Sequence, residues 1–443
     1  GPRLPPKKNK TRLSQHVASG SREKLQRQAS GDHHDVNRPL GPRPHADSFV
    51  CNDPIWRYRA FHDIFADAYI GDRCASPPLR PSCNRLKQTF TILSTVLDFV
   101  MERLPQSFQK IMKRLQRCLT DSAIFAGQFP IGSRDHGRFY GFLSSFVPKI
   151  KSMQPGESII CPGGWLQSST GQIVLLVATK QQNSYTLGIV NTGSQGQEYH
   201  PSKIEPITCE IKKCNTIKIS LIPSYRITDS STWFILLRDL IYPNDSNTGK
   251  NFYERVVPFM NRKPLYSNFD KSHADWRKPP KGHDASYAKA ALEAIRHSLM
   301  VSCKMTSTQC KYITLQMRWA FVRICQMDLS FAQSINSPEK SLLNLCCKQT
   351  SHACAKQSRT GPIKVEELQS IEADLNTFTD MIKEKFEIEQ RKRDVTLSFG
   401  NLKKGTENAA AFPLFGRFRR DQGVEHLIGS AQKPRILRPV ALS

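Results

Sequence analysis

Residues 161–201 constrain the fold of this chain more than any other stretch. They read CPGGWLQSSTGQIVLLVATKQQNSYTLGIVNTGSQGQEYHP, in which two apolar runs meet at a short polar turn. Glycines and small polar residues flank both runs, and this pattern predicts a β-hairpin.

The turn of this hairpin determines which of its residues face one another. A two-residue turn that includes Asn183 makes the numbers of paired positions sum to an odd value. Gln172 then faces Gly193 or its near neighbour Gln195, and Asn191 lies on the same face as Gln172. The hairpin therefore predicts a small group of amide side chains at one end of the two strands.

Apolar periodicity predicts helices on both sides of the hairpin and further strands after it. The predicted strands are 158–161, 172–181, 184–190, 204–211 and 216–222. The predicted helices are 86–104, 108–119, 231–241, 252–260, 285–300, 309–331, 339–356 and a long one after Pro362. The fold class expected from this order is α+β, an antiparallel sheet packed against helices, with additional N- and C-terminal helices.

Composition divides the chain into five segments. Residues 1–48 carry almost no large apolar side chains, so we expect a disordered basic segment. A helical subdomain (49–150), an α+β domain (151–361), a long amphipathic helix (362–394) and a basic flexible tail (395–443) are expected to follow. In the long helix, packing on its own domain is favoured over a coiled-coil seam.

The net charge of +26 is concentrated at the two ends. Residues 1–48 hold ten Lys or Arg against four acids, and residues 391–443 hold eleven against four. These tails are therefore the expected RNA-binding parts, and their deletion (1–48 and 395–443) is expected to remove most RNA binding. The helix face with Lys110, Lys113, Arg114 and Arg117 is more typical of a solvated surface than of a phosphate-binding stripe.

Thirteen cysteines without regular spacing indicate a reducing compartment rather than a disulfide framework, and we expect an intracellular, cytoplasmic protein. No apolar run is long enough to cross a bilayer, which predicts no membrane partner. The chain begins Gly1-Pro2 without a methionine, so we expect a fragment or a processed product.

No cofactor and no metal site are predicted. Cys209 and Cys214 lack a second pair at zinc-site spacing, and no phosphate-binding glycine loop occurs in a strand–helix context. Helix packing explains the later cluster best, namely Cys346, Cys347, His352 and Cys354.

One predicted helix start has the chemistry of a nucleophile site. The sequence Gly282-His283-Asp284-Ala285-Ser286 places a capping residue, Asp284, just before a helix. The unsatisfied N–H groups of a helix N-terminus stabilise an anionic nucleophile. The residue at the expected position is Ser286, which is a weak nucleophile unless a base lies beside it.

Together these features resemble papain-like cysteine peptidase domains that are circularly permuted, with the histidine strand before the cysteine helix. The resemblance covers roughly residues 49–357. The matching motifs are Gly163-Gly164-Trp165, Gly171, Asn191-Thr192-Gly193, Tyr199-His200-Pro201 and Lys263-Pro264-Leu265. It implies that Gln172, Asn191 and Ser286 occupy the triad positions and share one cleft.

Two of those positions depart from the family pattern. Gln172 stands where the family has histidine and cannot take a proton at neutral pH, and Ser286 stands where it has cysteine. The first hypothesis is therefore a catalytically inactive pseudo-peptidase that binds or scaffolds a protein partner. That partner is expected to be ubiquitin-like or part of a larger polypeptide, with Gly163, Gly164, Trp165, His200 and His283 as binding residues.

Two other functions stay open. The chain could be an active cysteine or serine hydrolase, peptidase or deubiquitinase-like, that uses Cys161 or Ser286 with His200 or His283 as its base. It could also be an RNA- or ribonucleoprotein-associated protein that binds through its basic tails. In the C-terminal tail Phe412, Phe415 and Phe418 alternate with arginines, as in surfaces that stack bases.

Overall fold

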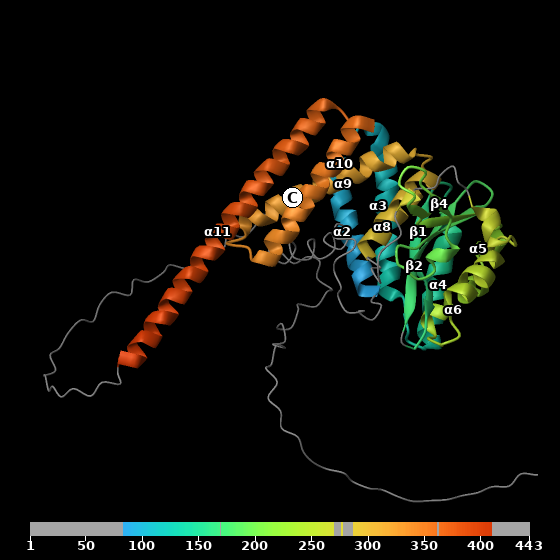
Figure 1. Ribbon diagram of the computed structural model, residues 1–443. Helices are drawn as coiled ribbons and strands as arrows, with labels where there is room; N and C mark the ends of the chain where they lie inside the picture. Colours follow the sequence, from blue (N-terminus) through green and yellow to red (C-terminus); the bar gives the residue numbers. More distant parts are fainter. Residues whose placement is uncertain (1–82, 169, 270–275, 278–286, 361–362, 410–443) are drawn as a thin grey trace, which may run out of the picture. The chain divides into compact units, whose positions relative to one another are not determined.

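The computed structural model describes residues 83–168, 170–269, 276–277, 287–360 and 363–409, with side chains as far as residue 397 (Figure 1). All of these residues belong to one compact unit. The expected N-terminal segment, Ser286, His283 and the tail beyond Ala409 lie outside the described residues. The described part has a mixed α+β architecture, as the sequence predicts.

The main sheet has four antiparallel strands in the order β1-β2-β3-β6. They are β1 (Ser158–Leu166), β2 (Gly171–Lys180), β3 (Tyr185–Val190) and β6 (Thr216–Ile222). Lys180 pairs with Tyr185, and Gln181 N–H donates to Ser184 O at 2.8 Å, so Gln182-Asn183 forms the two-residue turn. The predicted hairpin is confirmed, register included.

A second, smaller sheet has the order β4-β5-β7. It consists of β4 (Ser202–Ile204), β5 (Ile211–Cys214) and β7 (Trp276–Arg277). The predicted strand 204–211 is wrong, because this stretch is the loop that joins β4 to β5. Pro206 cannot donate to a ladder, and the left-handed backbone of Cys209 (φ 52°) reverses the chain.

Most predicted helices occur, with shifted ends. The structure contains α2 (Cys83–Met101), α3 (Gln106–Gln128), α4 (His136–Ser152), α5 (Ser224–Ile227), α6 (Ser230–Ile241), α7 (Gly249–Asn251), α8 (Tyr287–Ser302), α9 (Ser307–Phe331), α10 (Ser337–Thr360) and α11 (Val365–Ala409). Short turns are η1 (Gln197–Tyr199), η2 (Phe252–Val256), η3 (Val257–Met260) and η4 (Leu265–Asn268). Three expectations need correction: α4 was not predicted, 252–260 forms a π turn and a 3-10 turn, and α11 passes residue 394.

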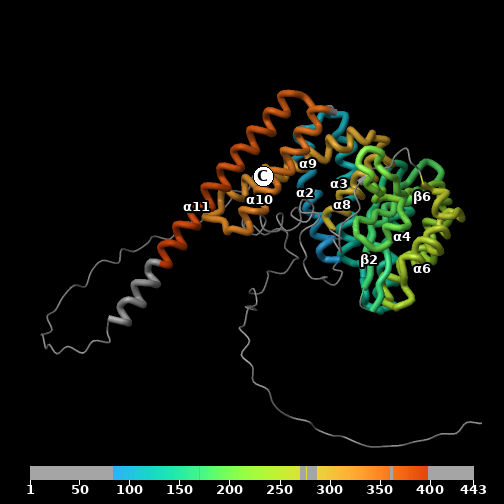
Figure 2. Tube along the Cα trace, viewed as in Figure 1, coloured from blue at the N-terminus to red at the C-terminus, as the bar shows by residue number. Residues whose placement is uncertain are grey.

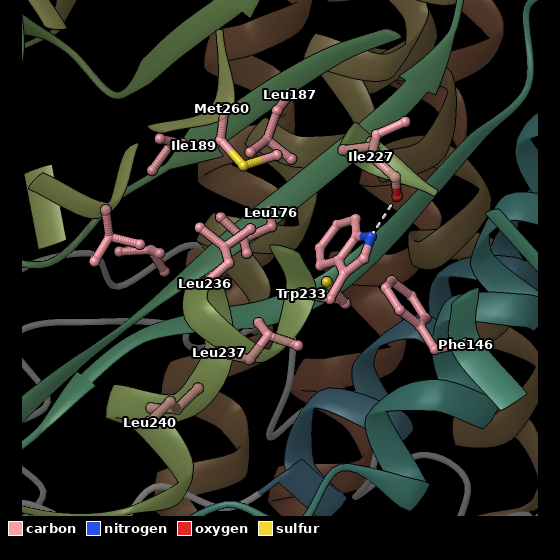
Figure 3. Close-up of a cluster of buried hydrophobic side chains, with 14 of the residues drawn as sticks. Phe146, Leu176, Leu187, Ile189, Ile227, Trp233, Leu236, Leu237, Leu240 and Met260 are labelled. Atoms are coloured by element: carbon pink, nitrogen blue, oxygen red, sulfur yellow. Dashed lines mark hydrogen bonds between the residues drawn. The ribbon is translucent and has the colours of Figure 1, made fainter. Parts of the chain in front are cut away.

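One face of the sheet is buried by α4 and α6. Their apolar side chains join those of Leu176, Leu187 and Ile189 in a single core. Figure 3 shows Trp233 of α6 at its centre, edge-on to Phe146 of α4, with the indole N–H donating to Ile227 O at 2.6 Å. Burial of such aromatic side chains supplies much of the free energy that holds a helix on a sheet.

The other face of the sheet is covered by α3 and α8. Ser122 of α3 accepts a hydrogen bond from Ile160 N–H of β1 at 2.9 Å. At Gly188 of β3, a Cβ would overlap the imidazole of His297 in α8. α3 also packs on α4, where Phe125 lies edge-on to Phe146 and Asp121 pairs with Lys149. Helices from the segment preceding residue 151 therefore complete the core of the α+β sheet.

The last three helices pack on one another (Figure 2). A buried stripe on α11 consists of Ile371, Leu375, Phe378 and Ile382. Beside this stripe, Glu367 and Asp374 of α11 form hydrogen bonds with side chains of α9, and we call this contact the polar seam. Glu367 accepts from Tyr312 Oη at 2.8 Å and from Gln316 Nε2 at 3.0 Å, and Asp374 accepts from Trp319 Nε1 at 2.6 Å.

In the described ranges, no helix contains an apolar stretch of the length that a bilayer crossing requires.

Candidate functional site

Gln172 lies near the start of β2, opposite Trp165 of β1, and is only 5% exposed. Its Nε2 donates to Ile173 O at 2.9 Å. A Cβ at position 193 would overlap its carboxamide, so Gly193 leaves the space that this side chain fills. The predicted approach of Gln172 and Gly193 is confirmed, and the glutamine acts there as a packing group.

Asn191 follows β3 and is completely buried. Its Oδ1 accepts from Gly193 N–H at 3.0 Å, and its Nδ2 donates to Gln195 O at 2.8 Å and to Tyr253 Oη at 3.2 Å. Both halves of the carboxamide are thus engaged in holding the loop after β3. Asn191 therefore stabilises a turn. Because its Nδ2 donates to Gln195 O and Tyr253 Oη, it does not donate to the side chain at position 172.

Gln172 and Asn191 belong to the face of the sheet that α4 and α6 cover. Side chains alternate along a strand, so Gln172 points with Val174 and Asn191 points with Ile189 into that core. Gly188 has the opposite parity and lies against His297 of α8. The helix that follows Ser286 therefore packs on the face opposite to the one that carries Gln172 and Asn191.

Two helices, α6 and α4, cover the face of Gln172, and α4 was not predicted from the sequence. A Cβ placed on Gly132 would lie 3.7 Å from the side chain of Leu166, the last residue of β1. Because Gly132 comes shortly before α4, this helix begins near the end of β1. Asp135 caps α4 by accepting from Arg138 N–H at 3.0 Å, and Tyr242 Oη lies 2.7 Å from His136 Nδ1. The phenylalanine spacing of α4 could have revealed this helix, but its start carries no cysteine.

Cys161 lies inside β1, where it pairs with Leu176. Its side chain belongs to the hydrophobic core, and burial raises the pKa of the thiol far above its usual range. A thiol in this environment stays protonated at neutral pH and is a poor nucleophile.

His200 is buried among hydrogen-bonding partners of its own. Its Nδ1 lies 2.8 Å from Cys214 O and its Nε2 lies 2.9 Å from Tyr253 Oη. Burial lowers the pKa of its imidazole to about 4. Through these two ring nitrogens His200 links the loop after β3 to β5 and η2. Because both nitrogens are occupied, His200 is not placed to act as a base for Cys161.

The motif Gly163-Gly164-Trp165 contributes to strand pairing and to packing of the sheet. Gly164 has φ 114°, a backbone conformation that favours glycine, and a Cβ there would overlap Gln172 O across the ladder. Trp165 packs on Phe252 and Tyr253 with ring centroids 5.7 and 5.9 Å away. Since Trp165 and His200 are buried, neither side chain lies on a surface that a partner would meet.

Within the described ranges, no three side chains of His, Cys, Asp or Glu type converge in a way that could hold a metal ion. The cysteines of α10, Cys346, Cys347 and Cys354, are buried thiols in helix packing.

Comparison of the chain with protein-family models, with curated proteins and with solved structures gave no match.

Proposed function

We propose that this chain is a non-catalytic protein-binding module whose resemblance to papain-like peptidases reflects ancestry. The observation that carries the proposal is the state of the two described triad positions. Gln172 and Asn191 are buried carboxamides whose hydrogen bonds stabilise the hairpin end, so neither can activate a nucleophile. The competing Cys161–His200 pair fails because burial keeps the thiol protonated and other groups occupy the imidazole.

The β4–β5 hairpin is the surface that best suits a protein partner. Ile204 and Ile211 form a cross-strand pair and are 67% and 54% exposed, and Ile207 in the loop between the strands is 91% exposed. Clustered exposed apolar side chains mark interaction sites more often than isolated ones do. In this sheet β4 is also an edge strand, whose free backbone groups can pair with a strand of a partner.

One set of measurements on the full chain tests both halves of this proposal, with the purified protein for turnover and with the protein in a cell extract for crosslinking. We expect no turnover of a fluorogenic peptide or of a ubiquitin conjugate. A photoreactive residue at Ile207 should crosslink one defined protein, ubiquitin-like or other, and the same residue at exposed Tyr140 of α4 should not. Recombinant partner should then bind Ile207→Asp at least tenfold more weakly. Turnover that disappears in Ser286→Ala, or equal crosslinking at both positions, would contradict the proposal.

A further inference from the structure

The outer face of α3 carries four cations within two turns of helix, which we call the α3 basic stripe: Lys110, Lys113, Arg114 and Arg117. The stripe and two glutamines, Gln106 and Gln109, line a shallow groove that is largely open to solvent along this one helix. Lys110, Lys113 and Arg117 are exposed, and the stripe extends over about 10 Å along the helix axis.

The stripe lacks the acidic neighbours that a solvated helix face normally has. The positions three and four residues away from Lys110 and from Lys113 carry Gln, Ser, Lys or Arg. Like charges at this spacing repel one another and destabilise a helix. Lys110 and Arg117 therefore add to the repulsion that Lys113 experiences.

Other elements offer little compensation. Arg117 lies 3.6 Å from Glu157, which precedes β1, whereas in the described ranges no carboxylate forms an ion pair with Lys110 or Lys113. The nearby Asp121 is engaged by Lys149 of α4 at 2.7 Å. Arg114 lies close to Gly156 and to the C-terminal end of α8 at Ser302. The stripe therefore keeps most of its positive charge available to an external anion.

We propose that the α3 basic stripe binds the phosphate backbone of a nucleic acid. Over about 10 Å it faces about three successive phosphates of one strand, and guanidinium groups match phosphate oxygens in bidentate pairs. The groove lining contains no aromatic side chain that could stack a base, so this contact is independent of sequence. The net charge of +26 steers the whole chain toward polyanions. This site is separate from the tails and from the β4–β5 surface.

The test compares two double variants of the full chain that remove the same charge. Lys110→Gln/Lys113→Gln alters the stripe, and Arg138→Gln/Lys151→Gln alters exposed cations of α4, outside the stripe. With a fluorescein-labelled 20-nucleotide poly(U), the stripe variant should bind at least fivefold more weakly and the control less than twofold. The slope of log K against log salt should fall by about 1.4 in the stripe variant, since each lost phosphate contact removes about 0.7. Equal losses in both variants, or no loss in either, would overturn the proposal.

A charge reversal separates binding from folding. Lys113→Glu relieves repulsion with Lys110 and Arg117, so its Tm should equal or exceed that of the wild type while its affinity for poly(U) falls. An affinity equal to that of the wild type would refute the assignment. Polyglutamate of matched charge is the competitor control: if it displaces poly(U) as well as unlabelled poly(U) does, the groove binds an acidic protein segment and the nucleic-acid proposal is wrong.

Discussion

His200 is a buried motif residue whose imidazole joins three parts of the fold. Its two ring nitrogens connect Cys214 O of β5 with Tyr253 Oη of η2, and Tyr253 in turn contacts Asn191. Burial favours the neutral imidazole at this site, because no anion lies among these partners to balance a positive charge. The Tyr-His-Pro motif is therefore explained by a buried hydrogen-bond network.

The stability of this network should depend on pH. The folded-state pKa of His200 is about 4, below its ordinary value of 6.5. Between these two pH values the imidazole is protonated in the unfolded chain and neutral in the folded chain. The stabilising contribution is complete above pH 6.5 and is lost as the pH falls toward 4. We expect the wild type to lose about 2 kcal/mol more than His200→Gln between pH 7 and pH 5, measured by urea unfolding. Parallel losses in the two proteins would contradict this role.

At the scale of elements, the packing of α8 on the sheet depends on one missing side chain. Gly188 has an ordinary backbone conformation, so its requirement for glycine comes from the imidazole of His297 above it. This contact fixes how closely α8 approaches β3.

Gly188→Ala should therefore destabilise the fold by about 1–3 kcal/mol, because the added methyl group overpacks the contact. The cost should shrink in a His297→Ala background, which makes room for it. Gly141→Ala is the matched control: no atom lies within 4 Å of its added Cβ, and α4 should tolerate or gain from it. Chemical denaturation of the wild type and the four variants gives these differences, and a neutral Gly188→Ala would show that α8 does not pack this closely.

The elements differ in how much the sequence reveals of them. The β2–β3 hairpin follows from local alternation and a two-residue turn, so its register could be narrowed to two alternatives, and the structure has the one that brings Gln172 to Gly193. α4 was missed because Gly137, Gly141 and Pro148 lower its helix propensity, although its phenylalanines pack it firmly in the core. The face that α8 covers depends on long connections and non-local packing, which no local pattern encodes. The shared cleft of Gln172, Asn191 and Ser286 stays a prediction, since Ser286 lies outside the described residues.

At the scale of the whole molecule, half of the net charge of +26 lies in residues 1–48 and 391–443, and the other half, which includes the α3 basic stripe, is spread over the residues between them. Residues 395–409 continue helix α11, so a truncation at 395 would cut a helix. A cut after Ala409 spares it and still removes six Lys or Arg against two acids from the C-terminal end.

A chain trimmed to residues 49–409 should keep the Tm of the full chain and bind poly(U) more weakly, with a smaller salt slope. The binding that remains should weaken at least fivefold further when Lys110→Gln/Lys113→Gln is added, because the stripe is then the remaining contributor. Anisotropy titrations at several salt concentrations measure both effects. Unchanged affinity after trimming would exclude the tails from RNA binding, and complete loss after trimming would exclude the stripe.

The polar seam between α9 and α11 has a consequence for how this protein can change over evolutionary time. Glu367 and Asp374 stand seven residues apart, two turns of helix, and each meets fixed donors on α9. Replacing any one donor costs a single bond, whereas inserting or deleting one residue between the two acids rotates one of them by about 100° away from its donors. The spacing along α11 is therefore less free to vary than its composition, and we expect homologues to accept substitutions there far more readily than gaps.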